Sequence, residues 1–323
     1  MTEPRTSRIA PLISMAMVLL VAVALIYVIR AAPFEVLGEI RPGTVTLSAV
    51  LMIGAMQIVF LLLATETWRR VVKVLTGANV GLFSSYMQLA AVAVGKYVPG
   101  KVWGFLARTG EMHRKNIPVH MAVMSSVVEQ MLLLAGALVV AVGAAMVAVP
   151  QLRGSILIAG LAGLIGIVFV SMKIPTIANW LLRKRMPNAV PVRIDGYHPI
   201  GILRFVLAYA MIWLLSGAIF STIYFSLFDV AVTAERVAAL VLGNTLGIAL
   251  GFFAFFAPGG IGVREAIATI VLAPFVPVRE ALLAAVAYRA WMVLIDGLNG
   301  LVLLIREAGR NNTLPAAVEG QED

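Results

Sequence analysis

Long apolar stretches constrain this chain more than any other feature of its sequence. A helix needs about 20 apolar residues to cross the hydrocarbon core of a bilayer. Six segments reach that length, roughly 9–30, 46–66, 118–149, 154–173, 201–228 and 281–305. The chain is 61% hydrophobic and 13% charged, whereas about a quarter of the residues in an average soluble domain are charged. The sequence therefore predicts a single all-α, polytopic membrane domain over residues 1–323, ending in a short cytoplasmic tail at 306–323.

The first apolar segment, 9–30, follows Arg5 and Arg8 and so invites comparison with a secretory signal. A signal has a shorter apolar region and a cleavage site of small residues. Because segment 9–30 is long enough to span, we expect a retained first helix.

Two further apolar regions, about 82–111 and 237–275, are broken in mid-run by Pro99-Gly100 and Pro258-Gly259. Proline removes a backbone donor and clashes with the preceding turn, and glycine tolerates positive φ. We therefore expect each region to form two half-helices around a bend. Each pair either crosses the membrane or dips in and returns.

Loop charges favour re-entrant pairs. If only the six unbroken segments span, one side of the membrane collects most of the cations, and both termini lie on that side. This is the positive-inside pattern of a protein in the cytoplasmic (inner) membrane with both termini cytoplasmic. If both broken regions spanned instead, the cluster at 183–193 would lie outside. The predicted cytoplasmic cations are Arg5, Arg8, Arg69, Arg70, Lys73, Arg114, Lys115, Arg183, Lys184, Arg185, Arg193, Arg306 and Arg310.

An internal repeat agrees with this arrangement. Aligning the two Pro-Gly dipeptides superposes 46–66 on 201–228 and 118–149 on 281–305, so the halves run from about 9–149 and 154–305. Each half has three spans, so the second is inserted upside down, which defines an inverted-topology repeat. Paired Gly/Pro-interrupted segments in two such halves indicate a transporter's midplane site. The alternative is coincidence, since glycine and proline are common in membrane helices and residue identity between the halves is low.

Cations flank the first break. Lys96 and Lys101 lie on either side of Pro99-Gly100, and Arg108 lies farther back toward the surface. Together with the N-terminus of the half-helix that starts near Lys101, they suit a phosphate headgroup. The alternative is that the lysines extend to the headgroup region and only anchor the element.

The second break is rich in glycine. Gly259, Gly260 and Gly262 permit a tight bend and a close backbone approach. In the first turn after the bend, Glu265 favours a helix N-terminus and Arg264 is placed to hold an anionic group.

Glu129 and Arg289 are ionisable residues inside predicted spans, where such residues are costly and usually functional. Glu129 and Arg289 are one position apart in the repeat alignment, which predicts an ion pair between the halves. The alternative is that each finds a partner within its own half. Asp296 is a further buried-acid candidate.

Little in the sequence indicates catalysis. The chain has no cysteine, and His113, His120 and His198 form no HExxH-type arrangement. We therefore expect no catalytic residues, no metal site and no cofactor. The net charge of +9 sits in short loops between apolar runs, where it faces anionic lipid headgroups rather than nucleic acid.

The two broken elements resemble the membrane region of lysylphosphatidylglycerol synthetases and its stand-alone relatives, the flippase-like UPF0104 family. The first element carries this resemblance in Gly95-Lys96-Tyr97-Val98-Pro99-Gly100-Lys101-Val102-Trp103-Gly104, with Arg108 and Glu129, and the second in Pro258-Gly259-Gly260-Ile261-Gly262-Val263-Arg264-Glu265, with Tyr288-Arg289. The resemblance spans nearly the whole chain. Gln130 departs from it, because relatives often have an arginine there. A synthase domain is not expected in the tail after Arg306.

The resemblance implies a flippase or transporter, not an enzyme, that moves an anionic or phosphate-linked (aminoacyl-, glycosyl- or polyprenyl-) lipid. Its expected partners are membrane lipids and a biosynthetic enzyme. The alternatives are an accessory subunit of lipid or glycan biosynthesis that transports nothing itself, and, less favoured, a membrane enzyme acting on a lipid phosphate.

Single cysteines introduced into this cysteine-free chain test the re-entrant arrangement. A membrane-impermeant maleimide is expected to label a cysteine near residue 100 only from the cytoplasmic side, and one near residue 260 only from outside. Labelling of both from one side would contradict the inverted arrangement.

Overall fold

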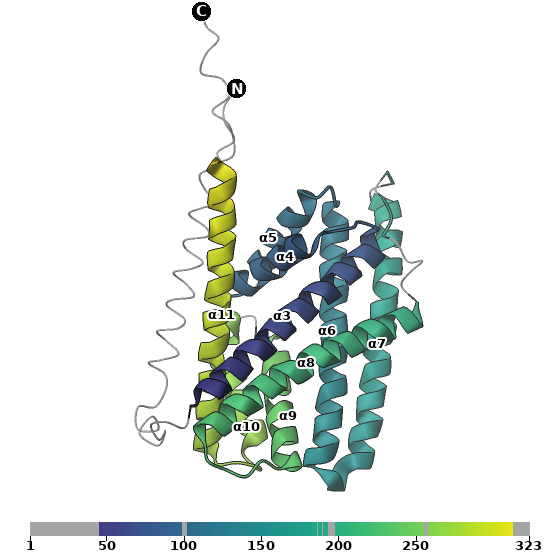
Figure 1. Cartoon of the computed structure of the whole chain (residues 1–323). Coiled ribbons are helices and arrows are strands. Elements are labelled where there is room, and N and C mark those ends of the chain that lie inside the picture. Colours follow the sequence, from purple (N-terminus) through teal and green to yellow (C-terminus); the bar gives the residue numbers. More distant parts are fainter. Residues whose placement is uncertain are drawn as a thin grey trace, which may run out of the picture.

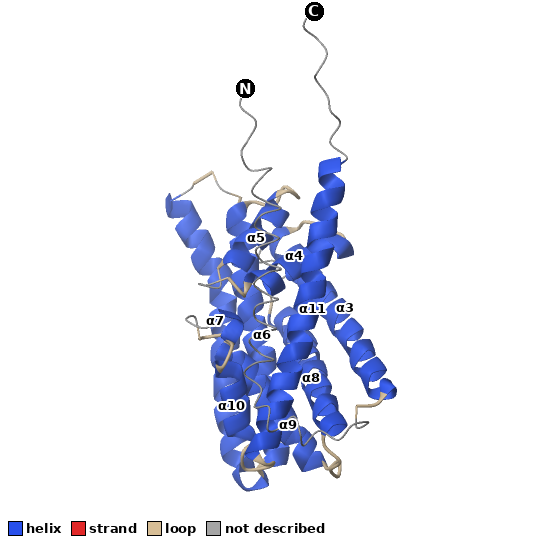
Figure 2. Cartoon of the chain, turned by 90° about the vertical axis from the view of Figure 1, so that its left-hand side faces the viewer, coloured by secondary structure: helices blue, strands red, loops and turns tan. Residues whose placement is uncertain are grey.

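The computed structural model describes residues 45–98, 102–185, 187–188, 190–192, 198–254 and 258–312. Within these ranges the chain is helical and contains no strand (Figures 1 and 2). The predicted first span at 9–30 lies outside the described residues, as do Pro99, Gly100 and Lys101.

Five of the six predicted spans are confirmed as long helices. They are α3 (Leu47–Thr76), α6 (Val119–Ala148), α7 (Arg153–Arg185), α8 (Pro199–Leu227) and α11 (Val278–Asn312). A single 3₁₀ turn, η1 (Pro150–Leu152), joins α6 to α7. Each of the five is long and apolar enough to cross a membrane. The protein is therefore a multi-pass membrane protein.

Both broken regions form pairs of shorter helices. The first pair is α4 (Leu82–Gly95) and α5 (Trp103–His113), and the second is α9 (Ala234–Gly251) and α10 (Val263–Leu272). A 3₁₀ turn, η2 (Pro258–Gly260), lies in the second bend. By length and hydropathy α9 also qualifies as a span. However, α10 packs back on α9 and returns the chain to the end of the molecule where α11 begins (Figure 1).

The two pairs occupy opposite ends of the helix bundle. In Figures 1 and 2, α4 and α5 lie toward the end where α11 finishes, and α9 and α10 lie at the other end. The C-terminal end of α3 and the turn between α5 and α6 share the first end (Figure 1). The cations at 69–73, 114–115 and 306 therefore gather at one end, as the loop charges predicted.

Helices from the two predicted halves pack on one another. Helix α3 packs on its counterpart α8, α6 of the first half packs on α9 of the second, and α11 packs on α4. Two large apolar clusters, one around Trp68 and Leu132 and the other around Phe220 and Leu272, each contain side chains from both halves. The halves are thus joined by exchanged contacts between long helices and broken pairs.

Helix ends follow local sequence. The Thr46 side chain accepts a hydrogen bond from Ala49 N at the start of α3, and Thr233 does the same for Arg236 N at the start of α9. Helix α3 stops at Gly77, whose φ of 76° lies in the left-handed region that glycine adopts without strain. These caps satisfy backbone groups that would otherwise lack partners.

Glycines allow the helices of the first broken pair to touch along their backbones. A Cβ atom added to Gly104 of α5 would lie 2.8 Å from Cα of Val92 in α4. One added to Gly95 would lie 2.3 Å from Cα of Gly104. The helices of the second pair also approach closely at a glycine, since a Cβ on Gly247 of α9 would lie 2.9 Å from the carbonyl oxygen of Arg264. Each re-entrant pair is therefore held together by direct helix contact.

Gly104→Ala is expected to destabilise the protein, because its new methyl group meets backbone rather than a movable side chain. Overpacking of this kind costs about 1–3 kcal/mol, which a lower melting temperature of the detergent-solubilised protein would register. Gly110→Ala on the same helix is the matched control, since nothing lies within 4 Å of a Cβ there. Equal melting temperatures for the two variants would contradict the close packing.

Candidate functional site

The bends of the two broken pairs meet in the middle of the molecule. The backbone N–H of Gly259 donates a hydrogen bond to the carbonyl oxygen of Lys96 at 2.8 Å. Lys96 directly follows α4, and Gly259 lies in the η2 turn. The structure therefore brings predicted site residues from both halves into contact.

Glycine is required where the second bend makes this contact. Gly259, Gly260 and Gly262 have φ values of 60°, 72° and 82°. A Cβ on Gly259 would also lie 2.7 Å from Nη2 of Arg289 and 3.2 Å from the ring of Tyr97. The predicted tight bend is confirmed at all three glycines. The predicted close approach is confirmed at Gly259 and Gly260, whereas nothing lies within 4 Å of a Cβ added to Gly262. Of Pro258, only its place in the η2 turn is described.

Asp296 of α11 holds the first bend. Its Oδ2 lies 2.7 Å from Nζ of Lys96 and accepts a hydrogen bond of 2.7 Å from the Tyr97 hydroxyl. Asp296 and Tyr97 are each 2% exposed. Lys96, a predicted headgroup ligand, therefore has its charge balanced by a carboxylate of the other half.

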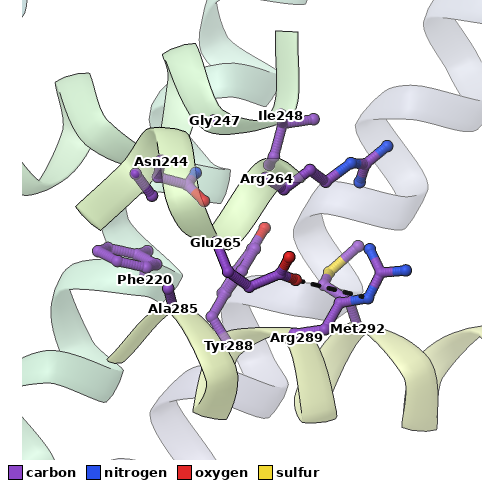
Figure 3. A pocket seen from close by; sticks show the side chains of 11 residues that line it. Phe220, Asn244, Gly247, Ile248, Arg264, Glu265, Ala285, Tyr288, Arg289 and Met292 are labelled. Carbon is purple, nitrogen blue, oxygen red and sulfur yellow. Dashed lines mark ion pairs between the residues drawn. The ribbon is translucent and has the colours of Figure 1, made fainter. Parts of the chain in front are cut away.

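Arg289 and Glu265 hold the second bend (Figure 3). Arg289 Nη1 donates to the Gly259 carbonyl oxygen at 2.9 Å, and its Nε lies 3.9 Å from Oε1 of Glu265. The other carboxylate oxygen of Glu265 accepts a 2.8 Å hydrogen bond from Gly262 N, which caps α10. Glu265 thus performs the predicted role at a helix N-terminus and also compensates a buried arginine.

Arg264 is the predicted site residue whose charge is least compensated. Among the residues that the structure describes, no carboxylate lies within ion-pair distance of its guanidinium. Its Nε, buried from solvent, makes no hydrogen bond. A cation without a counter-charge is costly inside a membrane protein, so the position calls for an anionic group.

A cavity of about 240 Å³ lies beside these bends and is lined by side chains from α3, α6, α8, α9, α10 and α11. Lys96 and Arg264 bring positive charge to its wall. Gln130, Ser216 and Tyr288 contribute neutral polar groups, and the rest of the wall is apolar, formed by Phe60, Leu133, Leu134, Ile212, Trp213, Ile248, Ala249, Phe252 and Met292. A wall of this composition suits an amphipathic molecule with a negative head.

A smaller cavity of about 30 Å³ adjoins the second bend. Arg264, Glu265, Arg289, Tyr288 and Asn244 line it, together with apolar residues (Figure 3). This volume holds about one or two waters. Arg264 lines both cavities and so links the larger one to the ionic contacts of the second bend.

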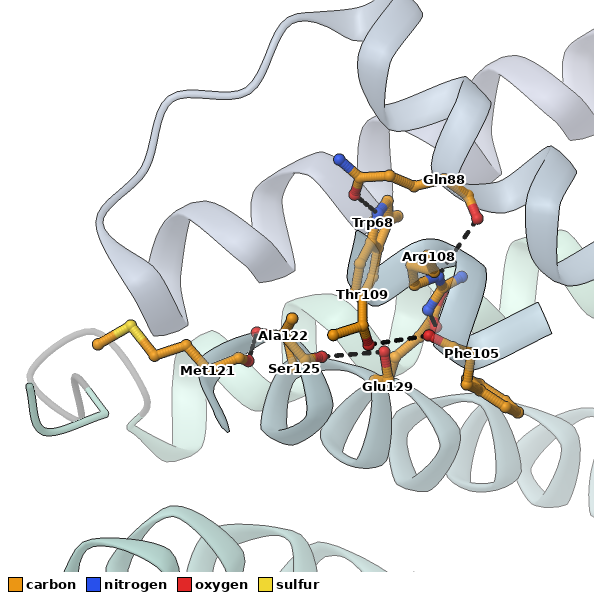
Figure 4. A network of polar contacts seen from close by, with 10 residues as sticks. Trp68, Gln88, Phe105, Arg108, Thr109, Met121, Ala122, Ser125 and Glu129 are labelled. Carbon is orange, nitrogen blue, oxygen red and sulfur yellow. Dashed lines mark hydrogen bonds and ion pairs between the residues drawn. The ribbon is translucent and has the colours of Figure 1, made fainter. Parts of the chain in front are cut away.

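Arg108 and Glu129 form a separate, closed ion pair between α5 and α6 (Figure 4). Arg108 stacks on Trp68, with its Cζ 4.0 Å from the ring centroid, and its Nε lies 3.4 Å from the carbonyl oxygen of Gln88. Trp68 Nε1 donates to the Gln88 side chain at 2.7 Å. The network ties α3, α4, α5 and α6 together, and neither charged residue lines the larger cavity.

The predicted Glu129–Arg289 pair is therefore wrong. Glu129 pairs with Arg108 of its own half, and Arg289 is likewise held by Gly259 and Glu265 of its own half. The alternative, in which each residue finds a partner within its own half, is the arrangement observed. Although Glu129 and Arg289 are only one position apart in the repeat alignment, the alignment does not predict which way their side chains point.

The sequence alone does not indicate a pairing role for Tyr97 or Asp296. The sequence predicts Asp296 only as a buried acid, and its partner Lys96 lies in the other half of the chain. The sequence does contain a hint of this ion pair, because Lys96 near one break and Asp296 in an apolar helix are both charged residues that need partners in a membrane. Within the described residues, no three His, Cys, Asp or Glu side chains are grouped so as to hold a metal ion.

Comparison with known proteins gives one family match. The family model of the lysylphosphatidylglycerol synthase TM region matches residues 9–300. A comparison with curated proteins finds no match.

Breaking the Arg108–Glu129 pair is expected to destabilise the protein strongly. In Glu129→Gln the Arg108 charge stays buried without its counter-charge, which costs about 3–5 kcal/mol. Removing both charges in Arg108→Met/Glu129→Leu should recover much of that loss. The melting temperatures of the purified variants check both expectations, and a Glu129→Gln protein as stable as the parent would contradict the structural role.

Proposed function

The chain belongs to the family of the lysylphosphatidylglycerol synthase TM region, matched over residues 9–300, and from this premise we propose that it moves an anionic, phosphate-linked lipid across the cytoplasmic membrane. The headgroup binds in the cavity beside the two bends, and the acyl or prenyl tails stay in the bilayer. The protein itself makes and breaks no covalent bond in this process.

The main support for this proposal is that the charge of Arg264 has no counter-charge among the described residues. Lys96, Arg264 and Arg289 bring three positive charges to the bends, and Asp296 and Glu265 bring two negative charges. A phosphate would supply the missing negative charge and hydrogen-bond acceptors for the partly buried guanidinium. The apolar part of the cavity wall suits the parts of a lipid next to its phosphate.

The inverted arrangement supports alternating access. Each re-entrant pair reaches the cavity from its own end of the bundle, so displacing one pair would open the cavity toward that end. The first pair is also attached to α11 by Tyr86 to Asn299 at 2.6 Å and by Glu111 to Arg306 at 2.9 Å. We propose that these contacts and the Lys96–Asp296 pair break and re-form as the headgroup passes.

Arg264→Met separates this proposal from a purely structural role. Met keeps most of the apolar side-chain stem and removes the charge, so the melting temperature should stay the same or rise while transport falls. The assay measures dithionite quenching of a fluorescent phosphatidylglycerol in liposomes that contain the purified chain. We expect at least a tenfold lower rate, which corresponds to about 1.4 kcal/mol in the barrier.

Two variants complete the experiment. Arg264→Lys keeps the charge and should retain part of the rate. Lys115→Gln removes a cation from an exposed turn outside the cavity and should transport like the parent. If the parent protein moves no anionic lipid, or if Arg264→Met moves it normally, transport through this cavity is rejected, and an accessory role beside a lipid-biosynthetic enzyme becomes the better account.

A further inference from the structure

We infer that the cavity selects lipids whose headgroup carries a phosphate and no protonated amine. The inference rests on the proposed function and narrows its substrate class. Aminoacylated and ethanolamine headgroups carry an ammonium group beside the phosphate, whereas phosphatidylglycerol and polyprenyl phosphates do not. The charges of the cavity wall discriminate between these two groups of lipids.

The described cavity wall is positive or neutral throughout. Its charged groups are the ammonium of Lys96 and the guanidinium of Arg264, and its remaining polar groups are the amide of Gln130 and the hydroxyls of Ser216 and Tyr288. An ammonium group bound in this space would lie close to one or both cations. Repulsion between like charges is strong where water is scarce, and such repulsion is a common basis of specificity.

The nearest carboxylates are already committed. Asp296 binds Lys96 and Tyr97, and Glu265 binds Gly262 N and faces Arg289. Turning either carboxylate toward a ligand's ammonium would leave Lys96 or Arg289 buried without a counter-charge. Glu129 is likewise held by Arg108, outside the cavity.

Aromatic side chains do not reverse this preference. Phe60, Trp213 and Phe252 line the cavity, and an ammonium group over such a ring gains a cation–π contact. That gain is smaller than the repulsion from a cation at similar range in a medium of low dielectric constant. Trp213 is also oriented by a hydrogen bond from its Nε1 to the Leu133 carbonyl oxygen at 2.9 Å.

The phosphate of an amine-free lipid finds complementary groups in the same space. It can bind Arg264 through N–H donors, while hydroxyls of a glycerol headgroup find the Gln130 amide nearby. Ser216 and Tyr288 are bonded to each other at 2.8 Å, and Ser216 also accepts from Asn244 at 2.9 Å, so they form a fixed polar part of the wall.

Lipid binding to the purified full chain in detergent tests the inference. Native mass spectrometry would compare phosphatidylglycerol, lysylphosphatidylglycerol and phosphatidylethanolamine with identical acyl chains. We expect phosphatidylglycerol to bind at least tenfold more tightly than either amine-bearing lipid. Binding of all three should be compared in Arg264→Met, where the preference for phosphatidylglycerol should be lost.

A carboxylate added to the wall should shift the preference. Gln130→Glu places one in the cavity with almost no change in shape, and the preference for phosphatidylglycerol over lysylphosphatidylglycerol should shrink at least fivefold. Gln151→Glu makes the same change at an exposed position in η1 and should leave the preference as in the parent.

The outcomes separate this inference from the proposed function. If lysylphosphatidylglycerol binds as tightly as phosphatidylglycerol and both depend on Arg264, the cavity remains a lipid site but the amine exclusion is wrong. An unchanged preference in Gln130→Glu would overturn the assignment of selectivity to the wall charge. If no lipid binds in an Arg264-dependent way, both the inference and the proposed function fail.

Discussion

In the hydrocarbon core of a bilayer, a backbone amide outside a helix has no water to bind and must find a partner within the protein. Two re-entrant bends create this difficulty twice, because each interrupts a helix at depth. The hydrogen bond from Gly259 N to the Lys96 carbonyl oxygen gives a backbone group of each bend a partner in the other bend. The rest of the central architecture depends on this contact, which needs glycine at 259 and places the charged residues of both halves around one space.

Charge pairing then distinguishes scaffold from site. Arg108 is buried, paired with Glu129, stacked on Trp68 and enclosed by four helices, so its charge is satisfied without any ligand. Lys96 and Arg289 are also paired, but their contacts connect each bend to the long helix α11. Arg264 completes the series with no carboxylate among the described residues at ion-pair distance. The cation whose charge is least compensated, Arg264, is therefore one that lines the cavity that we propose as the lipid site.

Much of the fold could be predicted because membrane insertion imposes simple rules. Apolar length located α3, α6, α7, α8 and α11, and the Pro-Gly dipeptides located both broken pairs. Helix α9 begins at Ala234, a few residues before the apolar region suggested, because the Thr233 cap and Glu235 start the helix in polar sequence.

Partner choice among buried charges could not be predicted in the same way. It depends on how each helix is rotated about its axis and on contacts between residues far apart in sequence. The Glu129–Arg289 prediction failed for this reason, since α5 places Arg108 directly against Glu129. The link from Lys96 to Asp296 was missed for the same reason, whereas the role of Glu265 followed from its local position three residues after Gly262.

The most direct test of the central claim is to determine where a lipid headgroup binds. An electron cryomicroscopy structure of the chain, held in phosphatidylglycerol nanodiscs and enlarged by a bound antibody fragment, would locate it. Our account predicts phosphate density within hydrogen-bond distance of the Arg264 guanidinium, in the cavity beside Lys96. Lipid density confined to the outer surface of the helices, with the Arg264 side chain paired to a protein carboxylate, would contradict it.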